Sequence, residues 1–162
     1  MSDYEHELLE MDVDQFKPFN LDGEQIVAKV LRVHDGDTIT IGWKQDPQWV
    51  RTNVRLTGID TPELHSKNAK ESKLCRLGRE WLKMNYLNKL IIVKCNEMDK
   101  YGRLLGELID YSDRSININN KLISLQFARI YGGDLHKNEW SDDELDRGIA
   151  SAEELNLTDP LK

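Results

Sequence analysis

Apolar side chains in several parts of the chain follow the period of two that is typical of β-strands. Such alternation places successive side chains on opposite faces of a sheet, one toward the core and one toward solvent. The stretches that alternate in this way or are rich in β-branched residues are residues 26–33, 38–41, 50–56, 90–95 and 103–110. Five strands are therefore expected. In the third, the even positions are apolar, so Arg55 is expected on the face opposite the core.

Three other stretches carry apolar residues at the spacing of amphipathic helices. The first helix follows a polar loop over residues 64–72, and the second is expected from about Asn117 to Ile130, before Gly132-Gly133. A capping box at residues 141–144 predicts a third helix, which ends before Pro160. The inward positions of the first two helices are expected to be Leu74, Leu77, Trp81 and Met84, and Ile118, Leu122, Leu125 and Phe127.

Five strands, with one helix after the third and further helices after the fifth, indicate an α+β fold. The arrangement predicts a five-stranded OB-type β-barrel with three α-helices. A chain of 162 residues fits one such domain. The expected division is an acidic, flexible segment over residues 1–25, the folded domain over residues 26–157, and a short tail over residues 158–162.

Composition narrows the class of protein. Apolar residues make up 39% of the chain and charged residues 31%, as in globular proteins. No run of apolar residues is long enough to cross a membrane, and the first residues lack the features of a secretion signal, so an intracellular location is expected. Cys75 and Cys95 form no CxxC pair and are expected to be reduced thiols, and the four histidines show no metal-ligand spacing.

The net charge of −7 is unevenly distributed along the chain. Residues 1–25 carry eight acids and one base, and residues 139–162 carry eight acids and two bases. The middle of the chain, by contrast, carries 19 bases and 13 acids. Because phosphate binding depends on the local field, a basic centre between acidic ends is compatible with nucleic acid as a partner.

Three short motifs carry the candidate chemistry. They are Asp35-Gly36-Asp37-Thr38, Arg55 followed by Asp60-Thr61-Pro62-Glu63, and Asp99-Lys100-Tyr101-Gly102-Arg103. Taken singly, each is a turn or a cap with solvated charges. Taken together and in this order, they combine carboxylates that suit a hard metal ion with arginines that suit a phosphate.

In these motifs the chain resembles the staphylococcal (thermonuclease or micrococcal) nuclease family, over roughly residues 26–157. The resemblance implies that Asp37 and Asp60 bind calcium, that Thr61 adds its backbone carbonyl, and that Glu63 is the general base. It further implies that Arg55 and Arg103 hold the phosphate, and that Lys100 and Tyr101 contact the nucleotide. The chain departs from the family at Gln126, where glycine is usual, in the tyrosine-rich stretch that here reads Tyr131-Gly132-Gly133, and in its acidic last helix.

The expected function is therefore that of a calcium-dependent phosphodiesterase, an endonuclease that hydrolyses DNA and RNA and acts as a monomer. Water would attack phosphorus with metal assistance, and two arginines would stabilise the transition state. A non-catalytic OB-type nucleic-acid-binding module is the alternative, and a partner-binding protein with acidic ends is a third hypothesis. Retention of all the acidic and basic site residues favours the enzyme.

Overall fold

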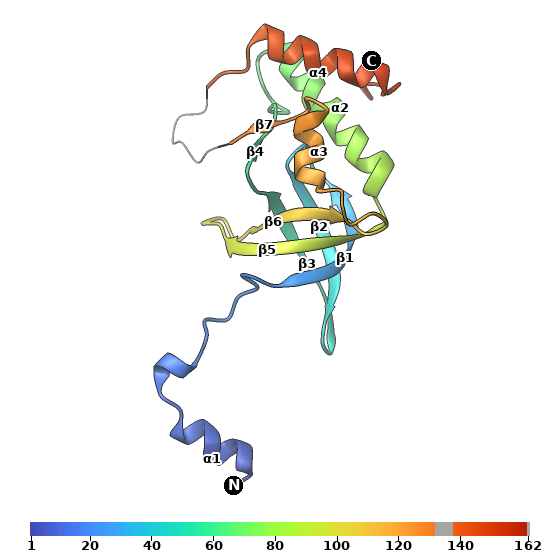
Figure 1. Cartoon of the computed structure of the whole chain (residues 1–162). Coiled ribbons are helices and arrows are strands. Elements are labelled where there is room, and N and C mark those ends of the chain that lie inside the picture. Colours follow the sequence, from blue (N-terminus) through green and yellow to red (C-terminus); the bar gives the residue numbers. More distant parts are fainter. Residues whose placement is uncertain (132–137, 162) are drawn as a thin grey trace.

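A computed structural model describes residues 1–131 and 138–161. At its centre lies a closed barrel of five strands in the order β1-β2-β3-β6-β5 (Figure 1). The strands are β1 (Gln25–Val33), β2 (Thr38–Gln45), β3 (Gln48–Leu56), β5 (Leu90–Met98) and β6 (Leu104–Asp110). All neighbours are antiparallel except β3 and β6, whose parallel pairing closes the barrel. The five predicted strands and the OB-type barrel are thereby confirmed.

The helices gather at one end of the barrel, apart from the first (Figure 1). They are α1 (Asp3–Glu10), α2 (Ala69–Tyr86), α3 (Ile118–Ser124) and α4 (Asp142–Glu154), with a short 3-10 turn at Val13–Gln15. Two residues each from β4 (Ile59–Asp60) and β7 (Arg129–Ile130) pair antiparallel beside them. This two-stranded sheet lies between the barrel and the helices, where the candidate site residues also lie.

Close packing joins α2, α4 and the segment that follows α3. The ring of Trp81 lies 5.8 Å from that of Tyr86 and 6.5 Å from that of Phe127, between centroids. A methyl group on Gly148 of α4 would come within 2.6 Å of both the Gln126 carbonyl oxygen and a methyl group of Leu74. Only glycine at this position allows α4 to approach α2 so closely.

Four α-helices occur in the described residues, so the predicted count of three is wrong. The additional helix is α1, which begins with a capping box at Ser2 and whose residues are all exposed. In Figure 1 it lies well away from the barrel. Because α1 buries nothing, its stability rests on local hydrogen bonds alone, and the flexibility of residues 1–25 stays a prediction.

Two other helix predictions need correction. The first core-facing helix, α2, begins at Ala69 with Asn68 as its cap, inside the stretch predicted to be a loop, and Met84 is exposed rather than inward. The second, α3, ends at Ser124 instead of Ile130, because Gln126 adopts a positive φ of 65° that turns the chain into β7. Gly132-Gly133, the predicted stop of that helix, lies outside the described residues. The capping box at Ser141 opens α4 as predicted.

Cys75 and Cys95 are both buried and free, in agreement with the predicted thiols. Burial raises the pKa of each to about 11. Within residues 1–131 and 138–161, no helix combines the length and the apolar character that crossing a membrane requires.

Candidate active site

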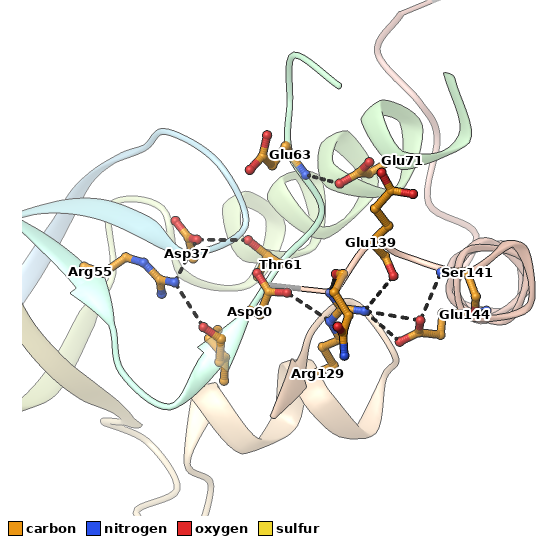
Figure 2. A network of polar contacts seen from close by, with 12 residues as sticks. Asp37, Arg55, Asp60, Thr61, Glu63, Glu71, Arg129, Glu139, Ser141 and Glu144 are labelled. Carbon is orange, nitrogen blue, oxygen red and sulfur yellow. Dashed lines mark hydrogen bonds and ion pairs between the residues drawn. The ribbon is translucent and has the colours of Figure 1, made fainter. Parts of the chain in front are cut away.

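Asp37 and Arg55 meet where β2 begins and β3 ends, since Thr38 and Arg55 are paired across the two strands. An Arg55 amino group (Nη2) lies 3.3 Å from Oδ2 of Asp37. The same oxygen accepts a hydrogen bond from the Thr61 hydroxyl at 3.1 Å, and Oδ1 accepts one from the Thr38 hydroxyl at 2.8 Å. These four polar groups are therefore fixed relative to one another, and Figure 2 shows three of them, Asp37, Arg55 and Thr61.

Arg55 also organises the turn that follows its own strand. Its guanidinium donates to the backbone carbonyl of Leu56, and to that of Ile59 at 3.0 Å. Within this turn, Gly58 adopts a positive φ of 76°, which glycine tolerates at little cost. The arginine thus holds the segment that leads into Asp60 and Thr61, in addition to its ion pair with Asp37.

The Asp35-Gly36-Asp37 turn brings β2 against this segment. The Asp35 carboxylate accepts a hydrogen bond from the backbone N–H of Asp37 at 3.0 Å. A methyl group on Gly36 would lie 3.2 Å from Cβ of Thr61, so glycine permits the close approach. The motif is therefore both the turn and the candidate metal site that were predicted, because the turn geometry places Asp37 next to Thr61.

The pKa values of the two acids of this turn are shifted in opposite directions. Burial, together with the charge of Asp37, raises the pKa of Asp35 to about 6. Burial also acts to raise the pKa of Asp37, but the charge of Arg55 and hydrogen bonds from Asp35, Thr38 and Thr61 outweigh it and lower that pKa below its ordinary value. Asp37 is consequently ionised at neutral pH, as a metal ligand must be.

Asp60 is held by a different arginine, one that sequence analysis did not identify. Nε of Arg129 donates to Oδ2 of Asp60 at 2.9 Å, and the two residues are register partners in the β4–β7 sheet. Asp60 is buried, with 4% of its surface exposed, so its carboxylate depends on partners within the protein. Figure 2 shows the two aspartates on either side of Thr61, each facing its own arginine.

Arg129 connects this carboxylate to the start of α4. Its Nη1 lies 3.2 Å from both carboxylate oxygens of Glu144, and its Nη2 donates to the carbonyl of Asn138. The guanidinium carbon also lies 4.3 Å from the centroid of the Trp140 ring, a cation–π contact. In the sequence, Glu144 was recognised only as the last residue of the capping box that begins at Ser141. Its second role depends on a strand pairing that the sequence does not reveal.

Glu63 lies at the rim of a cavity next to these residues. The cavity has a volume of about 360 Å³. Its lining comprises Asp60, Thr61, Glu63, Ser66, Lys67, Asn68, Glu71, Arg129, Asn138, Glu139 and Trp140. Glu71 in the first turn of α2 fixes the loop, because its carboxylate accepts from the backbone N–H of Glu63 at 3.2 Å and from the Ser66 hydroxyl at 2.6 Å. The exposed Glu63 side chain is therefore carried on an anchored backbone.

Arg103, Lys100 and Tyr101 lie on the turn between β5 and β6. The Asp99 carboxylate accepts from Nε of Arg103 at 2.7 Å and from the backbone N–H groups of Tyr101 and Arg103. Lys100 and Arg103 both lie over the exposed Tyr101 ring, at 5.2 and 5.6 Å from its centroid. The next residue, Leu104, opens β6 and pairs with Val54, so Arg103 directly precedes the strand that lies beside Arg55. Neither arginine lines the cavity.

The donor set fits a hard cation. Asp37 and Asp60 supply carboxylate oxygens, and the hydroxyl of Thr61, the residue after Asp60, bonds directly to Asp37. Calcium prefers such oxygen ligands and accepts water in its remaining positions. In the described parts of the chain, no three or more histidine, cysteine or acidic side chains lie close enough together to hold a metal ion. The two carboxylates would therefore be the main protein ligands of a bound cation.

Comparison with known proteins places this site within a family. The model of the staphylococcal nuclease homologues matches residues 53–157, more than half of the chain. This range includes Arg55, Asp60, Thr61, Glu63 and the turn with Arg103. Asp37 precedes it and is joined to it through contacts with Arg55 and Thr61.

Three relatives illustrate the similarity. An uncharacterized protein of Methanocaldococcus jannaschii is 30% identical, with 67% of this chain and 60% of the relative covered. An uncharacterized endonuclease of Escherichia coli O157:H7 is 31% identical over 65% of this chain and 61% of the relative. A thermonuclease of Staphylococcus hyicus is 33% identical over 48% of this chain and 45% of the relative.

The chain thus spans about 60% of the length of the first two relatives. The matched residues 53–157 include Arg55 at the end of barrel strand β3 and Asp60 in the β4–β7 sheet. On these grounds, the chain belongs to the family of staphylococcal nuclease homologues.

Proposed function

We propose that the protein is a calcium-dependent phosphodiesterase that cuts DNA and RNA internally. The observation that supports this most strongly is the joined set of Asp37, Arg55 and Thr61, with Asp60 next to Thr61 and Glu63 at the rim of the same cavity. Names of relatives such as endonuclease and thermonuclease agree with it. A monomeric state and an intracellular location remain part of the proposal.

Asp37 and Asp60 would hold the calcium ion through their carboxylates, and Thr61 would add its backbone carbonyl. When bound there, calcium would supply a Lewis acid for a non-bridging phosphate oxygen. Arg55 and two threonine hydroxyls already orient the Asp37 carboxylate, and Arg129 orients that of Asp60, so neither geometry depends on the cation. Such preorganisation reduces the rearrangement that binding requires.

Arg55 and Arg103 would contact the phosphate oxygens that gain negative charge as phosphorus becomes five-coordinate. A planar guanidinium bonds two oxygens at once and keeps its charge at every physiological pH. Arg103 has only its Nε engaged by Asp99 within the described residues, which leaves its terminal amino groups for a phosphate. Lys100 and Tyr101, on the same exposed turn, would contact the nucleotide.

Glu63 would orient the attacking water and accept its proton. The exposed carboxylate lines the cavity beside Asp60 and Thr61, within the same short stretch of chain. Its backbone is fixed by Glu71, so the side chain can reorient without movement of the main chain. These properties suit a general base that must be ionised and reachable by water.

Cleavage of a labelled single-stranded oligonucleotide tests this function, with calcium, magnesium or a chelator, for the parent and for Glu63→Gln. Cutting that requires calcium and is lost in Glu63→Gln is the expected result. Binding of the oligonucleotide without any cutting would instead favour the non-catalytic binding module.

A further inference from the structure

A groove with basic and aromatic side chains lies on the outer face of the β1-β2-β3 sheet. It has a volume of about 440 Å³. Its lining residues are Lys29, Leu31, Gly42, Trp43, Trp49, Val50 and Arg51. None of these is acidic, although the chain as a whole carries a net charge of −7. The groove is separate from the cavity that contains Glu63.

Strand register explains why Lys29, Gly42 and Arg51 share one face. Gly42 is paired with Lys29 on one side and with Arg51 on the other, so all three point outward in one cross-strand row. The next outward pair toward the hairpin tip is Lys44 and Trp49. Gly42 leaves room at the centre of the row, since a methyl group there would lie 2.9 Å from Leu31. An apolar floor is thus flanked by cations.

Trp49 is an exposed aromatic ring at the end of this face. Its relative exposure is 81%, and Nζ of Lys44 lies 5.7 Å from its ring centroid. The nearby Asp46 forms an ion pair with Lys44 at 3.4 Å, while Lys29 and Arg51 are exposed. The indole therefore offers stacking surface beside cations that are accessible to a ligand.

The same face leads directly to the candidate active site. Alternation along β3 places Trp49, Arg51 and Arg55 on the same side of the strand, in that order. Six residues of extended chain separate Trp49 from Arg55, which is about 20 Å at roughly 3.3 Å per residue. A ligand bound to Arg55 could follow the strand to the indole.

We propose that this groove is a secondary binding site for single-stranded nucleic acid, which extends from Arg55 along β3 to a base stacked on Trp49. This inference rests on the proposed function. Unpaired bases stack on exposed aromatic rings regardless of sequence, while phosphates bind neighbouring cations. OB folds hold roughly 4–16 nucleotides in this manner, which suits a path of this length.

The test compares two matched double variants. Trp49→Ala/Arg51→Gln removes an exposed aromatic ring and an arginine from the groove. Tyr111→Ala/Arg114→Gln removes an equivalent pair from another part of the surface, where the arginine lies 5.7 Å from the tyrosine ring centroid. Since Trp49 and Arg51 are exposed, both variants are expected to fold, and circular dichroism and thermal melting check this.

Fluorescence anisotropy would measure binding of labelled single strands of 4 and 16 nucleotides, with a chelator present to prevent cutting. We expect the groove variant to weaken binding of the longer strand about tenfold and that of the shorter strand less than twofold. Trp49→Phe/Arg51→Lys should recover most of the loss, because a ring and a charge remain. The control variant should bind both strands like the parent.

Binding of the longer strand within twofold of the parent in the groove variant would overturn the proposal. Equal loss for both variants would do the same, because it would indicate a general charge effect. Cleavage of the short strand by the parent is measured separately with calcium. If the parent protein cuts nothing but binds strands with the predicted dependence on length, the proposed nuclease activity is refuted and the proposed binding site in the groove is supported.

Discussion

Two aspartate–arginine pairs form the candidate site, and they are built in different ways. Arg55 is paired across the sheet with the neighbour of Asp37, and its other hydrogen bonds go to the backbone of its own turn. Arg129 comes from β7, 69 residues after Asp60, and its other contacts reach the start of α4. The first pair thus lies at the ends of two barrel strands, whereas the second joins the two-stranded β4–β7 sheet to α4.

Because of this difference, the two arginines are expected to have different roles. Arg55 lies half-buried at the end of β3, on the same outward face as the groove. Arg129 is surrounded by Asp60, Glu144 and the Trp140 ring. We expect Arg55 to act on the substrate, and Arg129 to position Asp60 and to link metal binding to the packing of α4.

Arg55→Lys should give the largest effect on activity. Lysine keeps the charge but loses the planar fork, so we expect cleavage to fall by about 100-fold or more while the fold survives. Glu63→Gln should cause a loss of similar size. The measurement is kcat/KM on a labelled oligonucleotide, with circular dichroism as a check of the fold. Unchanged turnover in either variant would remove that residue from its role.

Arg129→Gln should affect both stability and calcium affinity. The substitution removes the guanidinium group that binds both Asp60 and Glu144. Because Asp60 is buried, we expect a loss of about 3 kcal/mol in the free energy of unfolding. Urea denaturation with and without calcium measures both effects. Arg147→Gln, at an exposed position of α4, is the control and should be neutral. Loss of cleavage with unchanged stability and calcium affinity would contradict the positioning role.

Arg76 and Asp159 provide the same type of pair away from the site. Their contacts of 2.7 and 2.9 Å tie the end of the chain to α2, and the hydrogen bond from Arg76 lowers the pKa of Asp159. Because the pKa of Asp159 is lower in the folded than in the unfolded protein, the ion pair contributes its full stability at a pH above the unfolded-state pKa. This contribution is lost as the pH falls through the folded-state pKa. Asp159→Asn should therefore cost about 1 kcal/mol at neutral pH, less in acid, and nothing in activity.

A pH series of urea melts would check this last point. An equal cost of Asp159→Asn at neutral and acidic pH would show that the ion pair is not its source. A loss of cleavage would show that the Arg76–Asp159 pair also affects the active site.

Gln126→Gly tests whether the turn before β7 sets the position of Arg129. Gln126 has a positive φ of 65°, which glycine adopts more readily. We expect a gain of about 0.5–1 kcal/mol in stability with unchanged activity, measured by thermal melting and cleavage. A change in calcium affinity would instead mean that the turn, rather than side-chain contacts, places Arg129.

Deletion of residues 1–20 should give the smallest effect, because the barrel contacts begin after them, at Leu21, Gly23 and Glu24. These residues carry six acids and one base, and they could compete with substrate for the basic face. Cleavage at low salt should rise a few-fold, and the difference should vanish at high salt. No change at low salt would remove the acidic segment from the account.

The sequence was sufficient to predict those structural features that depend on one short segment of the chain. The alternation in β3 fixes which side chains face the core, so the outward position of Arg55 could be predicted and is confirmed. The capping box at Ser141 is similarly local. Met84 was placed in the core wrongly, because the buried face at this end of α2 runs through Leu82 and Tyr86 and leaves Met84 exposed.

Features that depend on distant partners could not be predicted. The two residues of β7 are a strand only because Ile59 and Asp60 pair with them, and nothing in their own sequence excludes the longer helix. Arg129 became part of the site through that pairing. In the sequence, Arg129 is a single arginine among apolar residues, and nothing there distinguishes it from a solvated arginine on the surface.

Calcium binding by isothermal titration, in the parent and in Asp37→Asn and Asp60→Asn, tests the central claim most directly. If both carboxylates hold one ion, the parent binds one calcium, and each substitution alone abolishes or greatly weakens that binding while the fold persists. Calcium binding that survives in either variant would contradict a single site shared by the two arginine-held aspartates.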